Sequence, residues 1–301
     1  MGDKYWKLGI IGWPLGYSLS PVMHTAALKA CGLEGEYREI KVKPEELEGW
    51  LGGEALKLDG FNVTMPHKEA VYQWLVEHPQ LGELASDLEK NIEAVNTVAI
   101  RNKRLAGYNT DALGFALTLA DPPISLEGDP VVILGAGGAA RAVAFALLKK
   151  RVSRLVIWNR PGGLQRAERL SAKLNELAKD SKFSTVTSNM EALPVSDAKL
   201  VVNTTPLGME GVHAEGVSLH PIFEKLHRGQ LIYDLVYKPV ETPLILEAQQ
   251  KGCSTISGWQ MLAAQGSRAF DIWIGIRVAK DGRPIRKVIR EALIGELSAT
   301  S

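Results

Sequence analysis

The sequence has few cysteines, no marked excess of either charge and no uninterrupted apolar run of membrane-spanning length. Only Cys31 and Cys253 occur in 301 residues, which excludes a disulfide framework and suggests a reducing cytosol. The 35 Lys and Arg nearly balance the 34 Asp and Glu, which argues against binding of nucleic acid or acidic membranes. Residues 131–148 form the longest apolar stretch, but Arg141 and several glycines interrupt it, and residues 1–9 are too polar for a signal peptide. We therefore expect a cytoplasmic protein with no membrane or nucleic-acid partner.

A metal centre is not expected either. The histidines have no accompanying cysteine or paired carboxylate at ligand spacing; they stand at positions 24, 67, 78, 213, 220 and 227. An apolar fraction of 46% with 23% charged residues is typical of a folded globular protein, and the length suits two ordinary domains.

Short apolar runs alternate with helical patterns in the first half of the chain. We expect strands at residues 8–11, 37–42, 61–64 and 94–100, and helices after Pro21, from Pro44 and over 68–77. This alternation predicts an α/β domain with a largely parallel sheet.

The pattern restarts at Val131 as though a second α/β domain begins there. A buried strand, VVIL, enters a glycine turn and then a long apolar helix, and further strands are expected at 154–158, 199–203 and 231–236. From residue 258 to the last residue the pattern is helical again.

The glycine turn of this second domain predicts a dinucleotide site. It comprises Gly135, Ala136, Gly137, Gly138 and Ala139. Glycine lets the backbone approach a pyrophosphate, and the free amides at the helix start then hold that anion. A tight strand-to-helix turn is the plainer explanation, but the preceding strand and the following helix favour dinucleotide binding.

The end of the next strand indicates which dinucleotide. NAD-binding proteins place a carboxylate there for the ribose hydroxyls, whereas this chain has Asn159 and Arg160. A guanidinium attracts a 2′-phosphate that a carboxylate would repel, so NADP is favoured over NAD. Taken alone, Arg160 is better explained as an arginine at a strand end that faces solvent, and it is the glycine turn upstream that favours NADP.

Several polar motifs of the first half fall at expected strand ends and helix starts, where open α/β sheets bind ligands. Their polar side chains suit a polyhydroxylated small molecule; they are Ser18, Ser20, Asn62, Thr64, Asn96, Asp111 and, near the C-terminus, Gln265. Each alone has a local explanation as a turn or capping residue, and Asp111 stands where a helix N-cap belongs.

Lys68 is harder to explain by stability. It follows Pro66 in the first turn of its predicted helix, where the positive end of the helix dipole disfavours a cation. A lysine so placed is suited to proton exchange, and Asp111 is the candidate partner that would hold it. The alternative is an exposed surface lysine.

Together these motifs resemble the shikimate/quinate dehydrogenase family over nearly the whole chain. The matching segments are GWPLGYSLSP, GFNVTMPHK, EAVNT, GYNTD, GAGGAARA, NTTPLGM, DLVYKPVETPL and GWQMLAAQ. The resemblance implies a two-domain α/β fold: a substrate domain (1–111), an inserted Rossmann-type NADP-binding domain (112–257) and C-terminal helices (258–301) that return to the substrate domain.

The resemblance also implies an activity, the reversible NADPH-dependent reduction of 3-dehydroshikimate to shikimate in aromatic amino-acid biosynthesis. It assigns Lys68 and Asp111 as the catalytic pair, Ser18 and Ser20 to the substrate carboxylate, and other side chains to the rest of the substrate, namely Asn62, Thr64, Asn96, Tyr237 and Gln265. Beyond the glycine turn and the Asn159–Arg160 pair, it assigns to the cofactor Thr204, Thr205, Pro206, Leu207, Gly258 and Met261.

Two departures leave alternatives open. The family's common histidine before the first serine is Tyr17 here, and its second arginine, usually four residues after the first, is Arg166, six after Arg160. A dual-specificity quinate/shikimate dehydrogenase using NAD is therefore the first alternative, and a non-catalytic nucleotide-binding paralogue is the second. The chain is expected to be a monomer or a homodimer.

Overall fold

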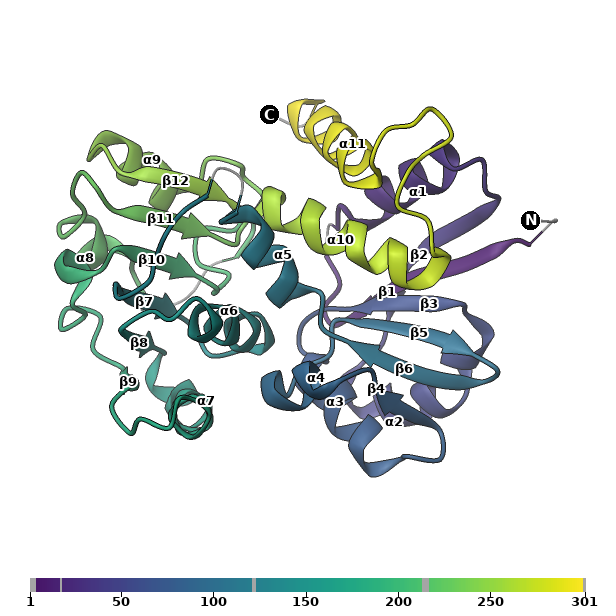
Figure 1. Cartoon of the computed structure of the whole chain (residues 1–301), viewed down its shortest axis with the longest axis horizontal. Coiled ribbons are helices and arrows are strands. Elements are labelled where there is room, and N and C mark those ends of the chain that lie inside the picture. The colour runs from purple at the N-terminus through teal and green to yellow at the C-terminus, as the bar shows by residue number, and fades with distance from the viewer. Residues whose placement is uncertain (1–3, 17, 121–122, 213–216, 300–301) are drawn as a thin grey trace. The chain divides into compact units, whose positions relative to one another are not determined.

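The computed structural model describes residues 4–16, 18–120, 123–212 and 217–299, so Tyr17 lies outside the described residues. The chain divides into two compact units, shown in Figure 1. The first unit comprises Met1–Gly114 and Leu262–Thr300, and the second unit comprises Phe115–Met261. Each unit has a sheet with helices packed on it, which confirms the predicted α/β class. The chain passes between the units inside helix α5 (Asp111–Thr118) and helix α10 (Gly258–Ile274).

The first unit begins with alternating strands and helices. Its elements before α5 are β1 (Trp6–Gly12), α1 (Ser20–Ala30), β2 (Gly35–Lys41), α2 (Leu47–Gly52), β3 (Gly60–Val63), α3 (Lys68–Glu77), β4 (Gly82–Leu84), α4 (Asp87–Ile92), β5 (Thr97–Arg101) and β6 (Arg104–Tyr108). After α10 comes α11 (Ile285–Ala299), which packs beside α1. Pro21 stands in the first turn of α1, where its missing N–H costs no helical hydrogen bond.

The sheet of this unit is more mixed than the sequence predicts. Its order among the described residues is β2-β1-β3-β5-β6-β4, and β5 runs antiparallel to both β3 and β6. The physical reason is a tight hairpin: Asn102 and Lys103 both have positive φ, as a two-residue turn between antiparallel strands requires. The expectation of a largely parallel sheet is therefore wrong for β3, β5 and β6, whose two pairings are antiparallel.

The second unit carries β7 to β12 with helices between them. Its elements are β7 (Pro130–Leu134), α6 (Gly138–Lys149), β8 (Arg154–Trp158), α7 (Leu164–Ala178), β9 (Ser184–Thr187), β10 (Leu200–Asn203), α8 (His220–Phe223), β11 (Leu231–Asp234), α9 (Pro243–Gln250) and β12 (Ser254–Ser257).

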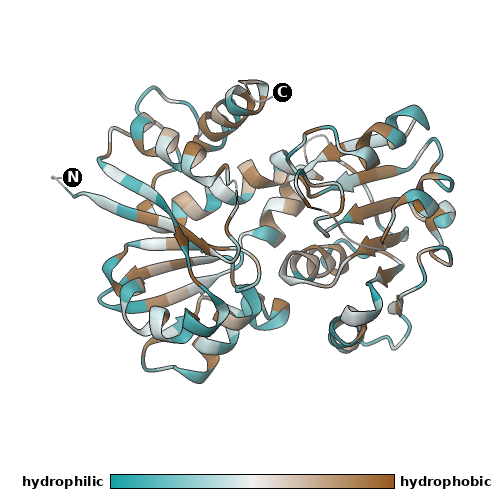
Figure 2. Ribbon diagram, turned by 180° about the vertical axis from the view of Figure 1, so that it is seen from behind, coloured by the Kyte–Doolittle hydropathy of each residue, from teal (hydrophilic) through white to brown (hydrophobic). Residues whose placement is uncertain are grey.

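All the strand pairs of this sheet are parallel, in the order β12-β11-β10-β7-β8-β9. This order is the doubly wound arrangement of dinucleotide-binding domains, in which β7 and β10 flank the point where the winding reverses. The central strands are apolar along their length, as Figure 2 shows in brown, because both of their faces are buried. Ligands of such sheets bind outside the carboxyl ends of the strands beside that point.

In the part of the chain that the structure describes, every helix is too short or too polar to cross a bilayer.

Candidate active site

Lys68 and Asp111 form an ion pair in the first unit. Lys68 is the first residue of α3 and Asp111 the first residue of α5, and Lys68 Nζ lies 2.6 Å from Asp111 Oδ2. Only 16% and 7% of the two side chains are exposed, so solvent screens the pair far less than it would a surface pair. The carboxylate offsets the unfavourable position of the ammonium at a helix start.

Asp111 is not the capping residue that a local explanation of its position supposes. The side-chain Oδ1 of Asn109 accepts the backbone N–H groups of Asp111 and Ala112, at 3.1 and 3.2 Å, and so caps α5. The Asp111 carboxylate is thereby left available for Lys68.

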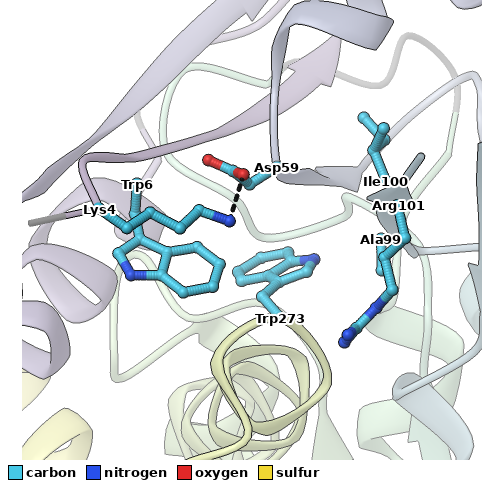
Figure 3. A pocket seen from close by; sticks show the side chains of 7 residues that line it. All are labelled: Lys4, Trp6, Asp59, Ala99, Ile100, Arg101 and Trp273. Carbon is cyan, nitrogen blue, oxygen red and sulfur yellow. Dashed lines mark ion pairs between the residues drawn. The ribbon is translucent and has the colours of Figure 1, made fainter. Parts of the chain in front are cut away.

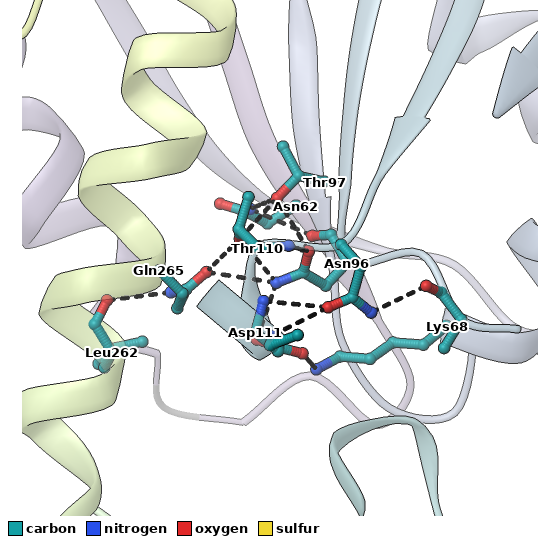
Figure 4. A network of polar contacts seen from close by, with 11 residues as sticks. Asn62, Lys68, Asn96, Thr97, Thr110, Asp111, Leu262 and Gln265 are labelled. Atoms are coloured by element: carbon teal, nitrogen blue, oxygen red, sulfur yellow. Dashed lines mark hydrogen bonds and ion pairs between the residues drawn. The ribbon is translucent and has the colours of Figure 1, made fainter. Parts of the chain in front are cut away.

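Asn96 links this pair to the rest of a polar cluster, drawn in Figure 4. Its Nδ2 donates to Asp111 Oδ1 at 2.8 Å, while its Oδ1 accepts the backbone N–H of Thr110 at 2.7 Å. Asp111 therefore has one carboxylate oxygen on Asn96 and the other on Lys68, which fixes the plane of its carboxylate.

The same cluster contains Asn62 and Gln265. Asn62 Nδ2 donates to Thr97 Oγ1 at 3.0 Å, and Gln265 Oε1 accepts from Thr110 Oγ1 at 3.2 Å. Gln265 comes from α10, more than 150 residues beyond the other members in the sequence. The fold thus gathers five sequence-predicted site residues in one place: Asn62, Lys68, Asn96, Asp111 and Gln265.

The other predicted substrate residues are placed less closely. Ser20 is buried at the start of α1, and its backbone N–H donates to Ser18 Oγ at 3.2 Å. Thr64 follows β3 and is partly buried. Tyr237 belongs to the second unit, after β11.

Thr97, Thr110 and Asn109 belong to the cluster but were not predicted as site residues. Thr97 and Thr110 lie inside the EAVNT and GYNTD motifs, so their hydroxyls were visible in the sequence. Their roles depend on which atoms meet across strands β5 and β6, and the motifs alone do not show this.

The glycine turn of the second unit joins β7 to α6, as the sequence predicts. Gly135 has φ of +104°, and a Cβ there would lie 2.6 Å from Thr204 Oγ1. Helix α6 begins at Gly138, and its first turn has neither an acidic residue nor a capping side chain. Its N–H groups and positive dipole end are therefore suited to an anion.

The segment 204–207, which follows β10, lies beside this turn, and the last residue of β10, Asn203, links it to a buried carboxylate. Asn203 Nδ2 donates to Asp234 Oδ1 at 2.9 Å, and Asn203 Oδ1 accepts from Thr205 Oγ1 at 2.6 Å. Thr204 Oγ1 donates to the Leu134 carbonyl at 2.6 Å. Burial raises the pKa of Asp234 from 3.8 to about 6, although hydrogen bonds from Thr242, Val236 and Asn203 oppose the rise.

The remaining predicted cofactor residues also follow strand ends. After β8, Asn159 Oδ1 accepts the backbone N–H of Arg160 at 3.0 Å, and the Arg160 side chain is exposed. Gly258 opens α10 against the Leu235 carbonyl, where no Cβ would fit, and Met261 is buried. Pro206 and Leu207 complete the segment after β10.

The first unit also has a small pocket, which differs from the polar cluster around Lys68 and Asp111. Lys4, Trp6, Asp59, Ala99, Ile100, Arg101 and Trp273 line it (Figure 3). Lys4 pairs with Asp59 at 2.7 Å, and Arg101 donates to the Ile272 carbonyl at 2.9 Å. The volume of this pocket is about 60 Å³. Among the described residues, no three metal-ligating side chains gather at one point.

Comparison with known proteins points to one family. The shikimate dehydrogenase substrate binding domain matches residues 10–98. Shikimate dehydrogenase (NADP(+)) of Symbiobacterium thermophilum is 42% identical over 277 residues, which cover 90% of this chain and 89% of that protein.

Solved structures of related proteins superpose on nearly the whole chain. Shikimate 5-dehydrogenase of Thermus thermophilus, in complex with NADP(H) and shikimate, superposes with a TM-score of 0.78 at 35% identity and covers 96% of this chain and 99% of its own. Quinate dehydrogenase of Corynebacterium glutamicum, in complex with NAD, gives 0.80 at 30% identity, with 97% and 100% covered.

Proposed function

Because the chain belongs to the shikimate dehydrogenase family, we propose that it catalyses the reversible NADPH-dependent reduction of 3-dehydroshikimate to shikimate in aromatic amino-acid biosynthesis. The observation that carries this proposal is the largely buried Lys68–Asp111 pair at 2.6 Å, held by Asn96 within a cluster of amides and hydroxyls. Such a cluster suits a substrate whose ring carries several hydroxyls, since each amide can offer both a donor and an acceptor.

The residues of the first unit divide between two tasks. Ser18 and Ser20, at the start of α1, would hold the substrate carboxylate. The ring hydroxyls would be held by Asn62, Thr64, Asn96 and Gln265, and Tyr237 would contribute from the second unit. A buried amide that finds no hydroxyl partner costs binding free energy, so this set would reject analogues that lack a hydroxyl.

NADP fits the groups that the second unit presents. The glycine turn from Gly135 to Ala139 and the uncapped start of α6 suit the pyrophosphate. Arg160, exposed after β8, would contact the 2′-phosphate, where the NAD-binding pattern has a carboxylate. The segment 204–207, together with Gly258 and Met261, would border the nicotinamide.

The chemistry needs a proton donor at the ketone oxygen. NADPH, when bound, supplies the hydride that reduces the ring carbon. Negative charge then develops on the oxygen, and Lys68 Nζ can stabilise that charge and donate a proton to it. Asp111 holds the ammonium in place, and Asn96 in turn fixes the carboxylate.

An absorbance assay of cofactor reduction tests the proposal. Purified protein is given shikimate or quinate, each with NADP or NAD, and the initial rates are compared. Turnover of shikimate with NADP far above the other three pairs is expected. Comparable rates with quinate or NAD would instead favour the dual-specificity enzyme, and no turnover in any pair would favour a nucleotide-binding paralogue.

The proposal includes a cytoplasmic location, which the scarcity of cysteine supports. It also includes a monomer or a homodimer, and light scattering on the purified protein distinguishes the two.

A further inference from the structure

Tyr37 contacts one of the proposed substrate residues, Asn62, without belonging to any of the sequence motifs. It lies on β2, its side chain is buried, and its hydroxyl donates to Asn62 Oδ1 at 2.8 Å. The phenol therefore links β2 to strand β3, where Asn62 stands.

This contact holds the Asn62 amide in place. An amide has nearly the same shape in its two orientations, so its hydrogen-bond partners select between them. On one side Nδ2 of Asn62 donates to the Asn96 carbonyl at 3.2 Å, which can only accept, and to Thr97 Oγ1 at 3.0 Å. On the other side the Tyr37 O–H donates to Oδ1 and so stabilises the orientation that the Asn96 carbonyl selects. Both N–H groups of Asn62 are thus committed within the protein, and its oxygen retains one lone pair for a ligand hydroxyl.

The Tyr37 ring is itself held by aromatic neighbours. The His24 ring stacks on it at a centroid distance of 4.6 Å and an interplanar angle of 17°, and Trp273 of α10 lies tilted at 6.3 Å. Burial lowers the pKa of His24 to about 3, so this ring is neutral at physiological pH and can pack without a counter-ion. The phenol hydroxyl therefore has little freedom to leave Asn62.

We propose that Tyr37 is a positioning residue: its hydroxyl holds the Asn62 side chain in place by a hydrogen bond to Oδ1, and so positions the group that Asn62 offers to the substrate. This inference rests on the proposed function only for the identity of the substrate. The Tyr37 hydroxyl has no role in hydride or proton transfer, so its loss acts on substrate binding.

Kinetics of Tyr37→Phe test the inference, because this change removes the hydroxyl and keeps the stacked ring. We expect the KM for shikimate to rise about tenfold, as for the loss of one buried hydrogen bond, while kcat and the KM for NADP stay within about threefold, smaller than that loss. The double variant Tyr37→Phe/Asn62→Ala should have the same KM for shikimate as Asn62→Ala alone, since Tyr37 acts through Asn62. Additive losses would show that Tyr37 acts independently and would overturn the inference.

Tyr233→Phe is the matched control. Tyr233 is also buried, its hydroxyl is 2.8 Å from Thr118 Oγ1, and its ring stacks on Phe115 at 5.1 Å, all within the second unit. Loss of its hydroxyl removes a comparable buried hydrogen bond and should leave the KM for shikimate unchanged. An equal rise of this KM in both variants would mean a general structural effect and would contradict a specific role for Tyr37.

A second measurement does not depend on turnover. The side-chain amide signal of Asn62 in nitrogen-labelled protein is identified as the pair of resonances missing from Asn62→Ala. In Tyr37→Phe this pair should shift and exchange faster with solvent, whereas in Tyr233→Phe it should not. An unchanged Asn62 signal in Tyr37→Phe overturns the inference. This result does not depend on catalysis: if the wild-type protein turns over none of the four substrate–cofactor pairs, the proposed function is rejected, and the Asn62 signal still tests the role of Tyr37.

Discussion

Lys68 occupies a position that stability alone disfavours, at the positive end of α3, where it forms an ion pair with Asp111. Lys68→Ala should lower kcat about 10²- to 10⁴-fold, the usual contribution of a general acid. The KM for NADP should change little, because the residues proposed to bind the cofactor belong to the second unit. Initial rates in the shikimate assay provide the measurement.

Lys90 offers a matched control for that change. Lys90 Nζ pairs with Asp87 at 2.8 Å, but this pair is exposed at the start of α4. Exposed pairs contribute about 1 kcal/mol or less, so Lys90→Ala should leave kcat unchanged. If Lys68→Ala retained wild-type turnover, Lys68 would not be the proton donor.

Asp234 predicts a pH dependence of stability, because its pKa is about 6 in the folded protein and 3.8 ordinarily. The folded state then binds the proton more tightly than the unfolded state, so ionisation destabilises the fold as pH rises from about 4 to 6. Between pH 4 and 7 the free energy of unfolding of the wild type, relative to Asp234→Asn, should fall by roughly 2 kcal/mol. Urea unfolding of both proteins at several pH values measures it, and a difference independent of pH would contradict the shift.

Single residues differ in how far the sequence predicts their place. The Lys68–Asp111 contact could be anticipated because the helix dipole makes the lysine conspicuous and an acid at a strand end is the natural partner. Tyr37 gave no such signal, since a tyrosine in a strand is ordinarily a core residue. Its contact with Asn62 depends on the parallel register of β1 with both β2 and β3, which only the folded sheet defines.

In the glycine turn between β7 and α6, Gly135 and Gly137 have different roles. Gly135 has positive φ, and a Cβ on it would meet Thr204, so Gly135→Ala should cost about 1–3 kcal/mol of stability even without cofactor. Gly137 has ordinary backbone angles and open space around it, so Gly137→Ala should leave the thermal midpoint unchanged.

For binding of the cofactor, Gly137 is expected to matter more than Gly135. A methyl group on Gly137 would stand where the backbone must approach the pyrophosphate, and the KM for NADP should rise about tenfold or more. Thermal unfolding without ligand and KM for NADP, measured on both variants, separate the two effects. An unchanged KM in Gly137→Ala would mean that the pyrophosphate binds elsewhere.

Elements were predictable where burial imposes a strong pattern. Strands β7, β8, β10 and β11 are continuous apolar runs, because both faces of a central parallel strand are buried. Strands β4, β9 and β12 were not predicted: they are three or four residues long and largely polar, so they show no periodicity of their own. They form at the sheet edges, against neighbours that already exist.

At the scale of the whole chain, the glycine turn and the polar cluster belong to different units. Gly135 lies in the second unit, whereas Lys68, Asn96 and Asp111 lie in the first. The restart of the strand–helix pattern at Val131 predicted a second domain, and the family resemblance implied domain bounds at 111 and 257. The two compact units divide after Gly114 and Met261, inside helices, where an unbroken helical pattern gives no boundary signal.

This division predicts that each ligand, alone, stabilises mainly its own unit. A ligand that binds the folded state at 100 times its Kd contributes about 2.7 kcal/mol, which slows hydrogen exchange through unfolding of that unit about 100-fold. NADP alone should therefore protect peptides around the β7–α6 turn, and shikimate alone those of β3 and β5, as mass spectrometry of exchanged peptides resolves. At the same concentrations, Gly137→Ala should weaken the protection by NADP about tenfold or more and keep that by shikimate. Equal protection of both units by shikimate alone would contradict this prediction and would mean that the two units unfold together. The assignment of NADP to the second unit and of shikimate to the first would then rest on the kinetics of Gly137→Ala and Lys68→Ala.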